Sequence, residues 1–218
     1  MEPIGVAIID GQKEAVVSGN DRIGIRVSDE KLTFIELKNS FYDRLREKLI
    51  KGNYKTYDVM KLNVYINDQL FGKGINDVVI HTARISKIRK FSVYINDRFM
   101  ENTSADGVII ATPIGSTSYS YSAGGPILIP SLKAMVISYI APFGSRLRPI
   151  VCPDNTKITI KIIGKFSSLA IIDGQKEAVV SENDRIDIRV SDEKLTFIEL
   201  KNSFYDRLRE KLIKDVVN

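Results

Sequence analysis

The chain has 218 residues, of which 44% are apolar and 27% are charged, and its formal net charge is +5. This length and composition favour one or two folded domains and exclude a disordered chain, which would have too few apolar residues to form a core. No apolar run approaches the roughly 18 residues of a membrane span, and the start at Met1-Glu2-Pro3 does not resemble a signal peptide. We therefore expect neither membrane association nor secretion.

Charge and rare residues narrow the functional classes. A basic excess suits an anionic small molecule such as a phosphorylated nucleotide. Nucleic acid is not an expected partner, because no cluster of lysine and arginine with interleaved aromatic residues occurs. Cys152 is the only cysteine, which rules out an internal disulfide and favours a cytoplasmic location. His81 is the only histidine, so we expect no His-based metal site and no Ser-His-Asp triad, and we interpret both residues as structural.

The chain begins with a duplicated segment. Residues 7–51 and 170–214 differ at only two of 45 positions, where Gly19 and Gly24 correspond to Glu182 and Asp187. Natural repeats diverge further, so this agreement indicates a recent or an engineered duplication. Alternating apolar residues predict strands at 23–27 and 32–37 of the first copy, and apolar residues at spacing four predict an amphipathic helix over 41–49. The second copy should have the same elements.

Two copies of one unit raise the question of which copy occupies the native position. They can compete for it, exchange between subunits, or occupy different positions. Glycine inside a strand costs about 0.5–1 kcal/mol, and Gly24 lies within a predicted strand. We therefore predict that the C-terminal copy occupies the native position. The alternative is that both differing positions face solvent and have no effect.

The middle of the chain is rich in predicted strands. Apolar residues alternate over 62–66, 91–95 and 158–162, and short apolar runs occur at 78–82 and 107–112. Many short strands at this spacing indicate an all-β sandwich with attached helices. We divide the chain into residues 1–53, the copied segment, and residues 54–218, a mainly-β sandwich domain that includes the second copy.

Residues 106–127 are the segment with the clearest chemical content. A buried strand is expected to end at Thr112, Pro113-Ile114-Gly115 turns the chain, and a helix is expected from Ser116 to Ala123. Free N–H groups at a helix start attract anions and hydroxyl oxygens, and the hydroxyl side chains over 112–119 suit ribose and amide groups. From composition alone, a capped helix with a polar face is the favoured interpretation.

These residues closely resemble the signature of the NAD kinases, which commonly reads DG, three apolar residues, Ala or Ser, and then TPTGSTAY-x-x-SAGGPI. In this chain Ile114 replaces the usual Thr or Ser, and Ser118 replaces Ala. Residues 74–80 resemble the Ala-Leu-Asn-Glu motif of that family, with Asp77 in place of Glu. Residues 141–150, 172–175 and 204–212 resemble further family segments. The resemblance covers residues 58–214, and the first copy repeats its last part.

The resemblance implies a site for NAD or NADP. The residues that it places against the dinucleotide are Asn76, Asp77, Asp106, Thr112, Thr117, Ser118, Tyr119, Ser122, Ala141, Asp173 and Gly174. Asp77 reaches less far than the usual Glu, and Ile114 lacks a hydroxyl that relatives use on the base. Ala141 is expected to approach the ligand from a neighbouring subunit, because sites in this family lie between subunits. We therefore expect a homo-oligomer, in which the copied segments can be exchanged.

The family's reaction transfers phosphate from ATP or polyphosphate, with Mg²⁺, to the 2′-hydroxyl of NAD. Members of the family have a Gly-Gly-Asp-Gly-Thr motif, whose glycines hold the donor phosphates and whose Asp is the proposed base for that hydroxyl. Nothing in these 218 residues matches this motif. We therefore expect dinucleotide binding with little or no kinase activity, and no catalytic residue within this sequence. One alternative is an active phosphotransferase whose donor site is supplied elsewhere, and another is an engineered duplication with incidental or no ligand binding. A lipid-kinase relative is a more distant alternative, because those enzymes lack the TPxGSTxY pattern that this chain has.

Overall fold

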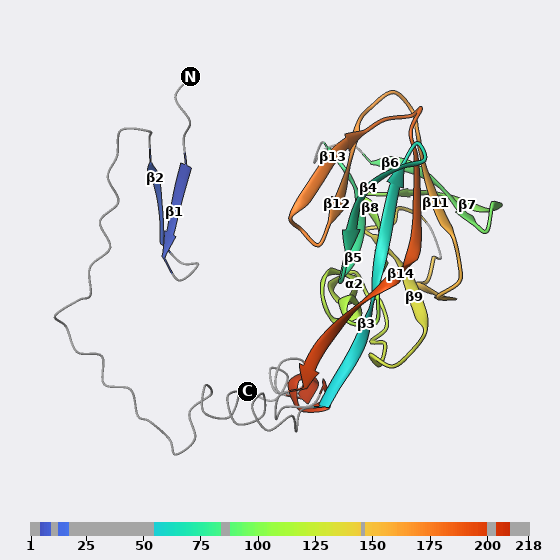
Figure 1. Ribbon diagram of the computed structural model, residues 1–218. Helices are drawn as coiled ribbons and strands as arrows, with labels where there is room; N and C mark the ends of the chain where they lie inside the picture. Colours follow the sequence, from blue (N-terminus) through green and yellow to red (C-terminus); the bar gives the residue numbers. More distant parts are fainter. Residues whose placement is uncertain are drawn as a thin grey trace, which may run out of the picture. The chain divides into compact units, whose positions relative to one another are not determined.

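The computed structural model describes residues 5–9, 13–17, 55–83, 88–144, 147–199 and 204–209 (Figure 1). The chain divides into two compact units, Met1–Lys51 and Gly52–Asn218. In the first unit, β1 (Gly5–Ile9) and β2 (Lys13–Val17) form an antiparallel hairpin. The strands and helix that we predicted over 23–49 lie outside the described residues.

The described strands of the second unit form two six-stranded antiparallel sheets. We call the first the β5 sheet, and its order is β10 (Ile150–Pro153), β9 (Ala134–Ile140), β8 (Gly107–Ala111), β5 (Asp77–Thr82), β12 (Ser168–Ile172) and β13 (Lys176–Val180). The second is the β3 sheet, with the order β4 (Gln69–Gly74), β3 (Lys55–Ile66), β14 (Arg185–Glu199), β11 (Ile158–Ile163), β6 (Arg89–Ile95) and β7 (Arg98–Ala105). The predicted mainly-β sandwich is confirmed.

The main core lies between the two sheets. Ile80 and Ile110 of the β5 sheet and Leu62 and Ile160 of the β3 sheet belong to one apolar cluster and are fully buried. A smaller cluster covers the opposite face of the β5 sheet, where Val79 and residues of β8 and β9 pack against the loop that follows the motif. Because β8 is covered on both faces, its sequence is apolar throughout.

Two hairpins explain the repeated sequence Val-Tyr-Ile-Asn-Asp at 64–68 and 93–97. Each repeat ends a strand with an Asn-Asp turn, and both turn residues have positive φ, with 51° and 67° in the first hairpin and 49° and 62° in the second. Asn and Asp tolerate this conformation better than other side chains do, and two-residue hairpin turns of this kind match the twist of the strands.

The C-terminal copy of the repeated segment is part of both sheets. Its Asp-Gly-Gln turn at 173–175 joins β12 to β13, a hairpin that periodicity did not predict. The two strands that we predicted after this hairpin are one strand, β14, with an irregularity in register between Val190 and Lys194. The prediction of two separate strands was wrong, because a β-bulge interrupts the alternation of apolar residues without ending the pairing of β14 with β3.

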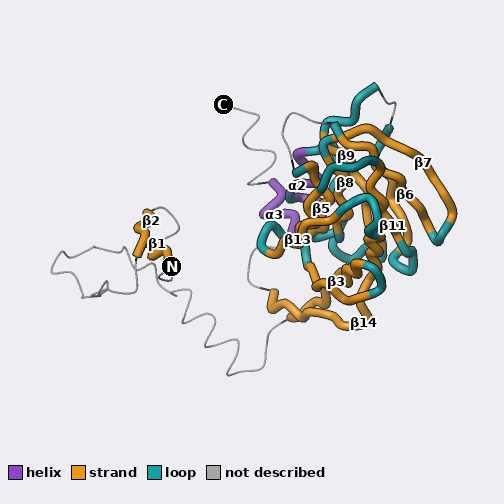
Figure 2. The backbone as a smooth tube through the Cα atoms, turned by 90° about the horizontal axis from the view of Figure 1, so that it is seen from above, coloured by secondary structure: helices purple, strands orange, loops and turns teal. Residues whose placement is uncertain are grey.

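Helices are few among the described residues. The predicted helix over 116–123 is a 3₁₀ turn, η1 (Gly115–Thr117), followed by a single α-helical turn, α2 (Tyr119–Ser122). The last described element is α3 (Phe204–Leu208), which lies within the amphipathic helix that we predicted for the second copy. Figure 2 draws these short helices in purple, and Figure 1 shows α3 at the lower end of β14. Within the described ranges, no helix has the length and apolar character to cross a membrane.

Candidate dinucleotide site

A sharp turn between β4 and β5 is held in place by one carboxylate. Asp173, at the end of β12, accepts hydrogen bonds from the backbone N–H groups of Ile75 at 2.8 Å, Asn76 at 2.8 Å and Asp77 at 3.0 Å. Asp173 itself has φ 50°, and its own N–H donates to the carbonyl of Asp77. The turn that presents Asn76 and Asp77 is therefore fixed by a residue about 100 positions away in the chain.

The signature segment is fastened to the same turn. The buried hydroxyl of Thr112 donates to the carbonyl of Ile75 at 2.6 Å and accepts from the N–H of Gly115 at 3.1 Å. A Cβ atom on Gly115 would lie 1.9 Å from the carbonyl oxygen of Asn76, so only glycine permits this approach. Thr112 and Gly115 thus bring η1 and Ser118 against the turn.

Asp173, the turn and the signature segment together enclose a cavity of about 370 Å³, which we call the Asp77 pocket. It is lined by Asn76, Asp77, Val79, His81, Ser118, Tyr119, Ile171, Asp173 and Gly174. Alternate residues of β5, namely Asp77, Val79 and His81, form its floor. The volume is at the lower end of the range for small-molecule sites, and the mixture of apolar walls and a few polar groups is typical of them.

Burial and a neighbouring charge change the acidity of Asp77. The residue is 5% exposed, and this desolvation, together with repulsion from the Asp173 carboxylate, raises the pKa of Asp77 from 3.8 to about 6. Both causes disfavour the charged carboxylate. A hydroxyl or amide donor of a ligand would relieve this cost, because a carboxylate is stabilised by hydrogen bonds from donors.

Six of the eleven predicted site residues line this pocket: Asn76, Asp77, Ser118, Tyr119, Asp173 and Gly174. Thr112 does not line this pocket, and its buried hydroxyl has a positioning role because it donates to the carbonyl of Ile75. The Thr117 hydroxyl donates to the carbonyl of Ile114. Ser122 is exposed on α2, away from the lining. The sequence did not single out Val79 and Ile171, and it treated His81 as structural, although the period-two alternation along β5 places His81 on the same face as Asp77.

Asp106 and Ala141 lie at the other end of β8. The N–H of Asp106 donates to the carbonyl of Ile140, which is followed by the exposed Ala141 with φ 43°. Asp106 precedes β8 and Thr112 follows it, so the two residues are separated by about 20 Å of extended chain. Neither Asp106 nor Ala141 lines the Asp77 pocket. The structure thus divides the predicted site residues into two groups.

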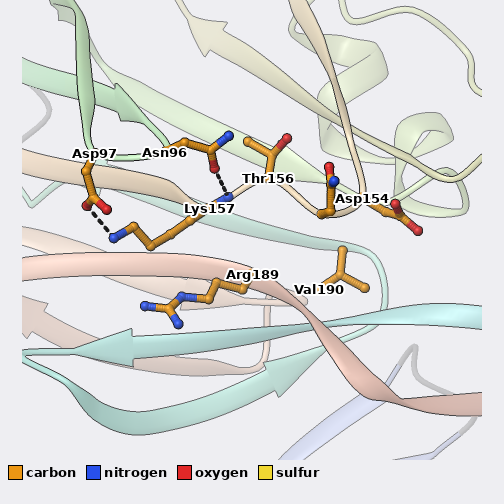
Figure 3. Close-up of a pocket in the computed structure, with 8 residues that line it drawn as sticks. Asn96, Asp97, Asp154, Thr156, Lys157, Arg189 and Val190 are labelled. Carbon is orange, nitrogen blue, oxygen red and sulfur yellow. Dashed lines mark hydrogen bonds and ion pairs between the residues drawn. The ribbon is translucent and has the colours of Figure 1, made fainter.

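A second cavity of about 390 Å³ contains none of the predicted site residues (Figure 3). Its polar groups largely bind one another: Lys157 forms an ion pair with Asp97, and the backbone N–H of Lys157 donates to the Asn96 side chain at 2.9 Å. Arg189 lies beside this pocket with its guanidinium 5.7 Å from the Tyr65 ring. These internal pairs leave the Asp77 pocket as the better candidate for a ligand site.

Solved structures share this architecture. The crystal structure of yeast NADH kinase complexed with NADH aligns with a TM-score of 0.74 over 81% of this chain and 55% of that chain, at 22% identity. An NAD kinase from Archaeoglobus fulgidus in complex with ATP aligns with a TM-score of 0.67 over 80% of this chain and 65% of that chain, at 24% identity. At these identities the likeness defines the fold class, which is that of the sandwich domain in these kinases.

Closer relatives define the family. The NAD kinase of Picrophilus torridus is 57% identical over 171 residues, and that of Thermoplasma volcanium is 49% identical over 172 residues; each match covers 78% of this chain and 63% of the relative. The family model of the ATP-NAD kinase C-terminal domain matches residues 75–200. The chain belongs to this family, which confirms the resemblance of its signature segment. It spans 63% of the length of the relatives that it matches.

Proposed function

We propose that this chain binds NAD or NADP in the Asp77 pocket and supplies the dinucleotide half of the NAD kinase reaction. The observation that carries the proposal is the convergence of two remote segments on one cavity. Asp173 holds the turn at 75–77, and Thr112 and Gly115 hold the signature segment against it. A site built by so many specific contacts is preorganised, which reduces the entropy cost of binding.

The chemistry of the pocket suits a nucleoside part of the ligand. The carboxylate of Asp77 and the amide of Asn76 are acceptors and donors for ribose hydroxyls or a base edge, and the ring of Tyr119 offers an apolar face. The cavity of about 370 Å³ suits one nucleoside better than a whole dinucleotide. We propose that the remainder of the ligand contacts Asp106 and Ala141 of a second copy of the chain in a cytoplasmic homo-oligomer.

We further propose that these 218 residues alone transfer little or no phosphate. The Gly-Gly-Asp-Gly sequence that holds the donor and the base in the family is not found in them, and a general base must lie within hydrogen-bond reach of the attacking hydroxyl. In the complete reaction ATP or polyphosphate, with Mg²⁺, would be the donor. An enzymatic assay for NADP, run against a Tyr119→Ala control, tests this part, and turnover well above the control would contradict it.

Calorimetric titration with NAD and NADP tests the binding proposal. Tyr119 and Tyr121 are matched for comparison, because both lie on α2 and are 42% and 41% exposed, but only Tyr119 lines the pocket. We expect one site per chain, weakened about tenfold by Tyr119→Ala and unchanged by Tyr121→Ala. No heat at millimolar concentrations of either dinucleotide would refute the proposal and favour an engineered duplication without ligand binding.

A further inference from the structure

β12 and the turn that follows it contribute three residues to the Asp77 pocket: Ile171, Asp173 and Gly174. All three belong to the repeated segment, and their equivalents in the first copy are Ile8, Asp10 and Gly11. Residues 7–17 and 170–180 are identical, whereas the first two residues of the hairpins differ, with Gly5-Val6 in β1 and Ser168-Leu169 in β12. The N-terminal copy therefore carries a complete second set of the pocket residues that this segment supplies.

The two hairpins also pair in the same way. In β1–β2, Ala7 lies opposite Ala15 and Ile9 lies opposite Lys13, and in β12–β13 the equivalent residues Ala170 and Ala178, and Ile172 and Lys176, lie opposite each other. The register of a strand decides which side chains face the core. From Ala7 onward the β1–β2 hairpin has the sequence and register of β12–β13, so it can present to β5 the same side chains that β12 presents from Ala170 to Ile172.

From these observations we propose that the β1–β2 hairpin of the N-terminal copy can occupy the place of β12 beside β5, where Asp10 takes over the role of Asp173. We call this place the β12 position. The proposal goes beyond dinucleotide binding, because it concerns the exchange of a strand and can be tested without a ligand. The surface to be filled is the edge of β5 that pairs with β12 from Val78 to Thr82.

One of the two positions at which the repeated segments differ favours the C-terminal copy. Asp187 is 1% exposed on β14, accepts a hydrogen bond from the Thr159 hydroxyl at 2.5 Å, and binds the Arg185 side chain at 3.1 Å. Gly24, its equivalent, has no side chain to make these contacts. The C-terminal copy is therefore favoured in the unmodified chain, and the N-terminal copy is a reserve that enters when the C-terminal copy is weakened.

Asp173→Asn is the change that weakens the C-terminal copy at the pocket. An amide has one acceptor oxygen where the carboxylate has two, so the three N–H groups of residues 75–77 are no longer all satisfied. The N-terminal copy keeps its intact Asp10. Exchange should therefore increase in Asp173→Asn and should disappear when Asp10→Asn is added.

Disulfide trapping tests this directly. Val79 of β5 lies opposite Ile171 of β12, and Ile8 is the equivalent of Ile171. Opposed residues of antiparallel strands have the Cα separation that a disulfide requires. In a Cys152→Ser background with Asp173→Asn, the pair Val79→Cys and Ile8→Cys should cross-link, within one chain or between two, as the band position on a non-reducing gel shows.

The control pair, Val79→Cys with Ile171→Cys, reports whether the sheet has formed and should cross-link in the chain without Asp173→Asn. If that pair cross-links fully in the Asp173→Asn background and the pair at 8 and 79 does not, the proposal is wrong. Adding Asp10→Asn should abolish the cross-link between positions 8 and 79. A cross-link that persists unchanged in that variant would overturn the role assigned to Asp10.

Dinucleotide binding gives a second measurement. We expect Asp10→Asn to leave affinity unchanged, Asp173→Asn to reduce it by about threefold, and the double substitution to reduce it by about thirtyfold. Equal losses of affinity in the single Asp173→Asn variant and in the double variant would show that the N-terminal hairpin does not replace β12. If the unmodified chain binds no dinucleotide, the proposed function fails, whereas the cross-linking experiment still decides the exchange.

Discussion

Asp77 is buried beside a second carboxylate, and this makes the stability of the domain sensitive to pH. The pKa of Asp77 is raised from 3.8 to about 6, so the folded state holds a proton that the unfolded chain releases at lower pH. The stabilisation from this proton is complete below pH 4 and is lost as the pH rises through 6. Between pH 4 and pH 8 the loss is about 2–3 kcal/mol.

We predict that Asp77→Asn removes this part of the pH dependence. The substituted chain should be more stable than the unmodified chain at pH 8 and similar to it at pH 4, as measured by urea denaturation over that range. Asp192→Asn, a change at an exposed carboxylate on β14, is the control and should leave the pH profile as it is. An Asp77→Asn profile parallel to the unmodified one would show that Asp77 is not the titrating group.

Gly115 shows how one residue without a side chain joins two segments. A Cβ atom at this position would meet the Asn76 carbonyl oxygen at 1.9 Å, whereas a Cβ atom at Gly124 would meet nothing within 4 Å. We predict that Gly115→Ala destabilises the domain by about 3 kcal/mol, because backbone atoms must move apart. Gly124→Ala, with φ 79°, should cost only about 1 kcal/mol of conformational strain.

Thermal and urea denaturation of these two glycine variants provide the measurement. Gly115→Ala should also weaken dinucleotide binding, since the Asp77 pocket lies between the two segments that would be separated. Equal stability losses at both positions would mean that the contact between Gly115 and Asn76 relaxes without cost.

At the scale of elements, β14 shows why the two copies are not equivalent. Asp187 of β14 lies opposite Thr159 of β11 and is buried, while Glu182, the other differing residue, is exposed. The alternative in which both differing positions face solvent is therefore wrong for Asp187. Burial of a carboxylate is tolerated here because Thr159 and Arg185 both donate to it.

We predict that Asp187→Gly destabilises the domain by about 2–4 kcal/mol, since it leaves the buried Thr159 hydroxyl without this acceptor and adds a glycine to a strand. Glu182→Gly, which copies the other difference between the segments, should cost no more than about 0.5 kcal/mol. Differential scanning calorimetry of the two variants gives the comparison. Equal melting temperatures would remove the reason for preferring the C-terminal copy.

At the scale of the whole molecule, the two groups of site residues lie at opposite ends of β8. If the complete site forms between two chains, a chain substituted in one group and a chain substituted in the other group can form one intact site together. Asn76→Ala and Asp106→Asn should each abolish most dinucleotide binding when tested alone. After unfolding and refolding as an equal mixture, about a quarter of the sites should bind again, because half of the dimers are mixed and each contains one intact site.

The matched control is a mixture of Asn76→Ala with Tyr119→Ala, two residues of the same pocket. This mixture should regain nothing if the pocket residues come from one chain. Recovery in neither mixture, from chains that are shown to be oligomeric, would place Asp106 in the same site as Asn76 within a single chain.

The sequence by itself determined the strand-rich class, the duplication and the family. Alternating apolar residues are a local property of a half-buried strand, and residues 106–127 form a continuous signature, so neither required knowledge of distant contacts. The same local reasoning separated β14 into two strands and missed the β12–β13 hairpin, because a β-bulge and a short partly exposed strand leave no clear alternation.

Only the tertiary structure decided how the site is built. The sequence assigned Asp173 and Thr112 to the ligand, whereas their polar atoms hold the turn at 75–77, which lies far from both in the chain. The raised pKa of Asp77 likewise depends on Asp173 and on burial by several strands. Such effects arise between segments that meet only after folding. A sequence pattern can therefore identify the residues of the site, but it does not determine which of them contact the ligand and which hold the others in place.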